Sequence, residues 1–134
     1  MTTTRTYVPI EDITPARLHS TRVVPLWVNG SPAYDYALSD KKLVFGKRPV
    51  NSESGLYLKI NNTGYMSIKV EAVYTLYTNT FQLEEEFPRT VKPGQSMEIW
   101  VMFKPNESGS FEDDLIVEVA QFEPQTVPLV GSAL

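Results

Sequence analysis

The chain has no cysteine and only one histidine, His19, among its 134 residues. Without thiols it can form neither a disulfide scaffold nor a thiolate metal site, and it has no cysteine nucleophile. Zinc sites combine several His or Cys ligands, which His19 alone does not supply. A Gly-x-Ser-x-Gly elbow and a glycine-rich phosphate loop are also missing. We therefore expect no enzymatic activity, no cofactor and no metal.

Long apolar runs and excess positive charge are lacking as well. No run approaches the roughly 18 residues that a membrane-spanning helix needs, and the first residues lack the apolar segment of a secretory signal. Acidic residues outnumber basic ones, 16 to 12, which gives a net charge of −4. A phosphate backbone is a poor partner for such a chain. We expect a soluble protein, made in a cytosol, that binds neither nucleic acid nor membrane.

A helical period is absent from residue 43 onward, where apolar and polar residues alternate instead. This period of two indicates strands with one buried face. The predicted strands are Leu43–Phe45 (stopped by Gly46), Leu56–Ile60, Ser67–Tyr77, Phe81–Leu83, Ser96–Lys104, Phe111–Val119 and Gln125–Val130. With turn signals between them, they predict an all-β, immunoglobulin-like antiparallel sandwich of seven or eight strands.

Two turns and one long strand lead to specific expectations. Asn62 and Gly64 tolerate positive φ, so we expect the chain to reverse there. Pro93-Gly94 predicts a type II turn, with Gly94 at the position that requires positive φ. On the strand Ser67–Tyr77, strict alternation predicts one shared face for Ile68, Val70, Ala72, Tyr74 and Leu76.

The first 42 residues differ from the rest of the chain. They contain four prolines, many Thr and Ser, and no sustained period. Their five basic and four acidic residues give a net charge of +1, against −5 for residues 43–134. We interpret residues 1–42 as an extended N-terminal arm, and residues 43–134 as the immunoglobulin-like β-sandwich.

An ordered set of short motifs runs through the sandwich region. It comprises Phe45-Gly46, Asn61-Asn62-Thr63-Gly64, Pro93-Gly94, Phe103-Lys104-Pro105, Gly109 with Leu115-Ile116-Val117, and Leu129-Val130-Gly131. In order and spacing this set resembles the ASH-type immunoglobulin-like domains of Hydin and centrosomal proteins, which are related to major sperm protein, and we place the chain in a bacterial or phage branch. The resemblance implies a sandwich fold and a habit of binding proteins, not a catalytic mechanism.

Several apolar side chains fall on the wrong face for a core. If Phe103 and its alternating neighbours point inward, Trp100 and Met102 point outward, and Tyr57 is outward on its own strand. Trp, Tyr and Met are enriched in protein interfaces. Three readings remain open: the arm covers this spot, a partner covers it, or it is simply exposed. The predicted protein-binding residues are Val24, Leu26, Trp27, Tyr57, Trp100 and Met102.

Two acidic triplets, Glu84-Glu85-Glu86 and Glu112-Asp113-Asp114, are the remaining polar clusters. Consecutive acids on a strand point to opposite faces, so neither triplet alone forms a calcium cage. The favoured interpretation is solvated hairpin charge; the alternative is a cation site where both triplets meet.

The first function hypothesis is a non-enzymatic assembly protein that binds other proteins through its arm and one sheet face. A short chain with a Pro/Thr-rich arm suits a phage virion component, either a head decoration or a neck or tail protein, present in many copies among virion structural proteins. The alternatives are a cellular, cytoplasmic adaptor that captures a peptide or filament, and a carbohydrate-binding module that uses Trp27, Trp100 and Tyr57.

Overall fold

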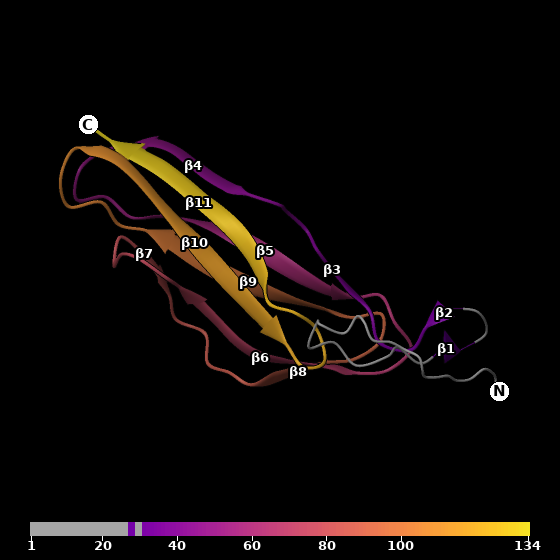
Figure 1. The fold of residues 1–134 in the computed structure, drawn as a ribbon. Helices are drawn as coiled ribbons and strands as arrows, with labels where there is room; N and C mark the ends of the chain where they lie inside the picture. The colour runs from indigo at the N-terminus through magenta and orange to yellow at the C-terminus, as the bar shows by residue number, and fades with distance from the viewer. Residues whose placement is uncertain (1–26, 29–30) are drawn as a thin grey trace.

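A computed structural model describes residues 27–28 and 31–134 of the chain. All regular elements of this part are β-strands, arranged in two sheets that form a sandwich (Figure 1). Within the described residues, no helix is long and apolar enough to cross a membrane. The predicted all-β sandwich is confirmed.

The sandwich contains one five-stranded and one four-stranded sheet, so its strand count slightly exceeds the predicted seven or eight. The five-stranded sheet has the order β4 (Leu43–Arg48), β11 (Gln125–Ala133), β10 (Gly109–Val119), β6 (Ile68–Thr75) and β8 (Arg89–Val91). The four-stranded sheet has the order β3 (Tyr36–Leu38), β5 (Ser54–Asn62), β9 (Ser96–Phe103) and β7 (Phe81–Leu83). Two short strands, β1 (Trp27–Val28) and β2 (Ser31–Pro32), pair only with each other.

Neighbouring strands pair antiparallel, with one exception: β11 and β4 are parallel. Gly46 does not stop β4 as predicted. It has a φ of 75° and lies where the register between β4 and β11 shifts, and the strand continues to Arg48. Glycine tolerates this left-handed conformation, which lets the strand bend and pair again.

Aromatic rings from both sheets meet in the core. Phe103 on β9 stacks on Phe81 of β7 at 5.0 Å between ring centroids, and lies 5.5 Å from Phe45 of β4. Phe103 is fully buried, as are Ile99 and Val101 on the same strand. The predicted inward face of β9 is therefore correct.

Strand β6 does not keep a single inward face along its length. Val119 pairs with Val70 but Glu118 pairs with Ala72, so one extra residue of β6 forms a bulge. A bulge reverses which side chains point inward. Val73 is buried in consequence, while Tyr74 is 38 % exposed, so the predicted common face of Val70 and Tyr74 is wrong.

The chain turns at both predicted places, but the two turns are built differently. Gly94 has a φ of 77°, and the amide of Gln95 donates to the carbonyl of Lys92, as the predicted turn requires. Asn62 and Gly64, by contrast, do not have positive φ. Asn62 is buried instead, and its side-chain amide donates to the carbonyls of Met66 and Val91. Its Oδ1 accepts from the amide of Gly64.

Part of the segment assigned to the arm lies in the sandwich. Residues Tyr36–Leu38 form β3, which pairs with β5. Just before it, the carbonyl of Ala33 accepts from the amides of Tyr65 and Met66. Gly64 is needed there because a Cβ would lie 2.5 Å from the Ala33 oxygen. The division into an arm and a sandwich stays a prediction. The pairing of β3 with β5 moves residues 36–38 from the predicted arm into the sandwich.

Candidate functional site

Tyr57 and Trp100 form an aromatic pair on the outer face of the four-stranded sheet. They are directly opposite each other on β5 and β9, and their ring centroids are 4.6 Å apart at an interplanar angle of 55°. Tyr57 is 54 % exposed, whereas Trp100 is partly buried. The structure thus brings together two of the predicted protein-binding residues on a rigid sheet.

Gly55 explains how Trp100 is oriented. The indole ring lies over this glycine, and a Cβ added there would overlap the ring atoms Cζ2 and Cε2. Gly55 is part of β5, not of a turn, so its role is a close approach rather than a chain reversal. The predicted strand began only at Leu56, so the sequence did not signal this contact.

Met102 is not part of an exposed spot. Its side chain is only 7 % exposed, so the predicted exposure of Met102 is wrong. By register it lies between Gly55 on β5 and Gln82 on β7. The indole of Trp100 occupies the space over Gly55, the residue opposite Met102 on β5.

Glu85 completes the sheet edge beside Trp100. Strand β7 ends at Leu83, which pairs with Val101. Beyond that pair, the backbone amide of Trp100 donates to the Oε2 of Glu85 at 3.1 Å. The carboxylate replaces the backbone carbonyl of a longer strand. Glu85 Oε1 is buried without a hydrogen-bond partner among the described residues. This role contradicts purely solvated charge for the Glu84-Glu85-Glu86 triplet.

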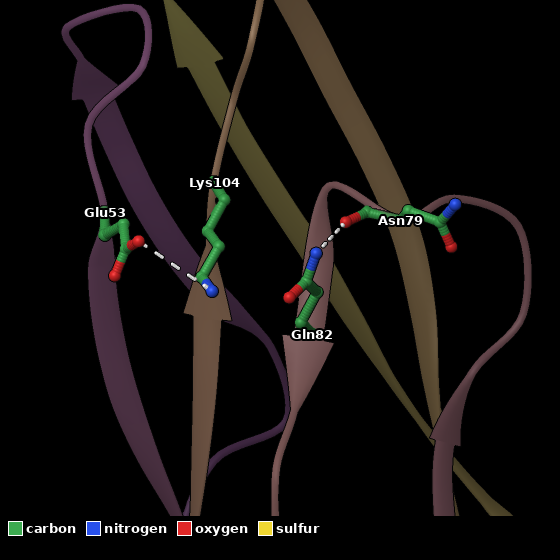
Figure 2. A network of polar contacts seen from close by, with 4 residues as sticks. All are labelled: Glu53, Asn79, Gln82 and Lys104. Atoms are coloured by element: carbon green, nitrogen blue, oxygen red, sulfur yellow. Dashed lines mark hydrogen bonds and ion pairs between the residues drawn. The ribbon is translucent and has the colours of Figure 1, made fainter.

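Two polar contacts lie at the end of β9 and on β7 (Figure 2). Lys104, which follows β9, approaches Glu53 with 3.8 Å between Nζ and Oε2. On β7, the side chain of Gln82 donates to the carbonyl of Asn79 at 2.8 Å. An exposed ion pair contributes about 0–1 kcal/mol, so this pair adds little to the stability of the fold.

The second acidic triplet also has a structural role. Asp113 is buried, and its Oδ1 accepts from the amides of Leu76 and Tyr77 while its Oδ2 accepts from the amide of Thr78. These bonds hold the loop that follows β6. In the part of the chain that the structure describes, no three His, Cys, Asp or Glu side chains gather as metal ligands would.

The remaining predicted binding residues, Val24, Leu26 and Trp27, belong to the predicted arm. Val24 and Leu26 lie outside the described residues, as does His19, and Trp27 is described only as the first residue of β1. The six predicted binding residues therefore fall into three groups: a pair that meets, one buried methionine, and three arm positions that stay a prediction.

Both the fold and the sequence define the class of protein. The architecture is an immunoglobulin-like sandwich, and residues 36–131 match the profile of the HYDIN/CFA65/VesB-like immunoglobulin-like domain. The chain therefore belongs to this family. No curated protein sequence matches it.

Solved structures with a similar fold come from animals and bacteria. The ASH/PapD-like domain 7 of human CEP192 superimposes with a TM-score of 0.67 at 12 % identity, over 98 % of this chain and 96 % of that one. SSP-19 of Caenorhabditis elegans, of the MSP-domain family, gives 0.57 at 15 %, over 72 % and 98 %. The Acinetobacter baumannii CsuC–CsuE complex of a pilus chaperone and a tip subunit gives 0.56 at 11 %, over 74 % and 57 %. This family and fold fit a role in protein interaction or assembly.

Proposed function

We propose that the chain is a non-enzymatic protein-binding component of a multi-copy assembly. It contacts its partner through the N-terminal arm, with Val24, Leu26 and Trp27, and through the Tyr57–Trp100 pair. The sandwich acts as a rigid support, and the arm extends the contact area.

The Tyr57–Trp100 pair is the observation that carries this proposal. Tyrosine and tryptophan supply large contact areas at a modest cost in side-chain entropy, and they are common hot spots of interfaces. Here the indole is held in place by Gly55 and the tyrosine next to it stays half-exposed. A partner would therefore meet aromatic side chains that are already ordered, which favours binding.

For the biological setting we propose a phage virion, as a head decoration or a neck or tail protein. The Pro- and Thr-rich composition of residues 1–42 supports this setting. A cellular adaptor is the second candidate, and the similarity to the human CEP192 domain and to SSP-19 favours it. Both settings use the same surface.

The geometry favours a protein partner over a carbohydrate. Sugar rings stack on flat and accessible aromatic faces. One face of Trp100 lies on Gly55, and Tyr57 is tilted by 55° against it, so the two rings do not form a flat platform.

Co-assembly with the purified products of neighbouring genes tests the proposal. Tyr57→Ala and a truncation lacking residues 1–26 should each weaken binding at least about tenfold, the loss expected for a hot spot. Tyr65→Ala is the matched control, because Tyr65 is a similarly exposed tyrosine on the loop after β5. Full binding by both altered proteins would refute the proposed surface.

A further inference from the structure

Strand β11 is paired along only part of its outer side. On one side β10 covers it from Gln125 to Ala133. On the other side, β4 pairs with it only from Leu129 onward. Among the described residues, the segment from Gln125 to Pro128 therefore has an open backbone edge. Such an edge is a template for another strand.

Pro128 shows which backbone groups face this open edge. It lies inside the β10 ladder, opposite Asp114, with both of its neighbours paired. A proline is tolerated there when its nitrogen points away from the paired strand. Because alternate residues of a strand point to the same side, the N–H and C=O of Thr126 also face the open edge. Among residues 27–28 and 31–134, nothing pairs with these two groups, so Thr126 offers one free donor and one free acceptor.

A groove of about 550 Å³ lies along this edge. Tyr36 and Leu38 of β3 line it together with Phe122 and with the β11 residues Gln125–Val127. The rings of Tyr36 and Phe122 pack edge to face at 5.0 Å, which fixes the apolar end of the groove. In Figure 1 the chain runs from β3 to β4 along this side of β11.

The rim of the groove carries more negative than positive charge. Asp35, Asp40 and Lys41 line it, and no other charged side chain does among the described residues. Asp35 already accepts from the amide of Tyr36, while Asp40 accepts from the hydroxyl of Ser39. Both carboxylates retain further acceptor capacity. A basic side chain of a partner would complement them.

We propose that this groove binds an extended segment of a partner protein by strand addition to the open edge of β11. The segment continues the line of β4, pairs with Thr126, places an apolar side chain against Phe122 and Leu38, and places a basic side chain near Asp35 and Asp40. At about 3.3 Å per residue, the edge accommodates roughly four residues. The inference rests on the proposed role in protein binding, but concerns a surface separate from the Tyr57–Trp100 pair.

The test uses the full chain and a library of random linear peptides of about ten residues, followed by affinity measurements on the selected peptides. We expect selected sequences with alternating apolar residues and at least one Lys or Arg. Thr126→Pro should weaken their binding at least about tenfold, because it removes the edge donor while Gln125 keeps an extended backbone. Thr126→Val is the matched control: it keeps the N–H and the strand preference, and should bind within about threefold of the parent.

Thermal melts first establish that both Thr126 variants are folded. Peptide binding should also slow hydrogen exchange at the Thr126 amide, a readout that does not depend on substitution. Equal affinity for Thr126→Pro and Thr126→Val would overturn the proposal, as would failure to select any peptide. A Thr126 amide that is already protected in the free protein would show that the chain fills its own groove, and would also overturn it. Peptide binding unaffected by Tyr57→Ala would separate this groove from the proposed assembly surface.

Discussion

The ring of Phe103 on β9 lies directly against the backbone of Gly131 on β11. A Cβ added to Gly131 would be 2.8 Å from the ring atoms Cε2 and Cζ. The two residues belong to different sheets, and both come from the family motifs seen in the sequence. Glycine is required at position 131 because the aromatic core of the sandwich uses the space of its missing side chain.

Gly131→Ala should therefore destabilise the protein by about 1–3 kcal/mol, since the added methyl group overpacks the core. Equilibrium urea unfolding measures the loss. Ser132→Ala is the control, because Ser132 is not among the buried side chains, and should change stability by less than about 0.5 kcal/mol. A Gly131→Ala protein as stable as the parent would mean that Phe103 can move aside.

Gly94→Val should cost at least about 1 kcal/mol, and the cause differs from that at Gly131. A Cβ at Gly94 would meet no atom within 4 Å, so the penalty comes only from its φ of 77°. Gly94→Asn should cost less, because asparagine tolerates this conformation better than a β-branched residue. Thermal unfolding ranks the three proteins, and equal melting temperatures would contradict the backbone explanation.

Asp113→Ala should destabilise the protein by roughly 1–3 kcal/mol, because the amides of Tyr77 and Thr78 lose their acceptor. The amide of Leu76 loses one of its two acceptors and keeps the carbonyl of Asp114. The neighbouring acid Glu112 is exposed, so Glu112→Ala should have little effect. Urea unfolding gives the free energies, and hydrogen exchange should locate the change in residues 76–78. If the two alanine variants were equally stable, the carboxylate would not hold this loop.

Stability should fall at alkaline pH, with a contribution from Tyr36. Burial raises the pKa of this tyrosine to about 12, above its ordinary value of 10.0. The unfolded chain then loses the phenol proton first, so the contribution is fully present below pH 10 and is lost between about pH 10 and 12. Tyr36→Phe should reduce the slope of stability against pH in this window, measured by urea unfolding. Tyr65→Phe is the exposed control, and an equal reduction by it would contradict the assignment.

The sequence predicted the features that depend on local periodicity and turn chemistry. Alternation along β9 placed Phe103 in the core, and Pro93-Gly94 predicted a turn with positive φ at Gly94. Both follow from steric rules that act within a few residues.

The predictions that were wrong concern features that depend on residues distant in the sequence. The bulge in β6 reversed its inward face at Val73, and Met102 is buried although alternation placed it outward. Asp113 and Glu85 became hydrogen-bond acceptors for distant amides, although an acidic triplet looks the same whether it is solvated or buried. Pairing partners decide these outcomes, and a single sequence does not display them.

The parallel ladder between β4 and β11 has a mechanical consequence. The chain enters β4 at Leu43, opposite Leu129, and leaves β11 beyond Ala133, which is opposite Arg48. Tension applied at Leu43 and beyond Ala133 would therefore pull the two strands past each other along their length. The interstrand hydrogen bonds would be loaded together instead of opening one by one.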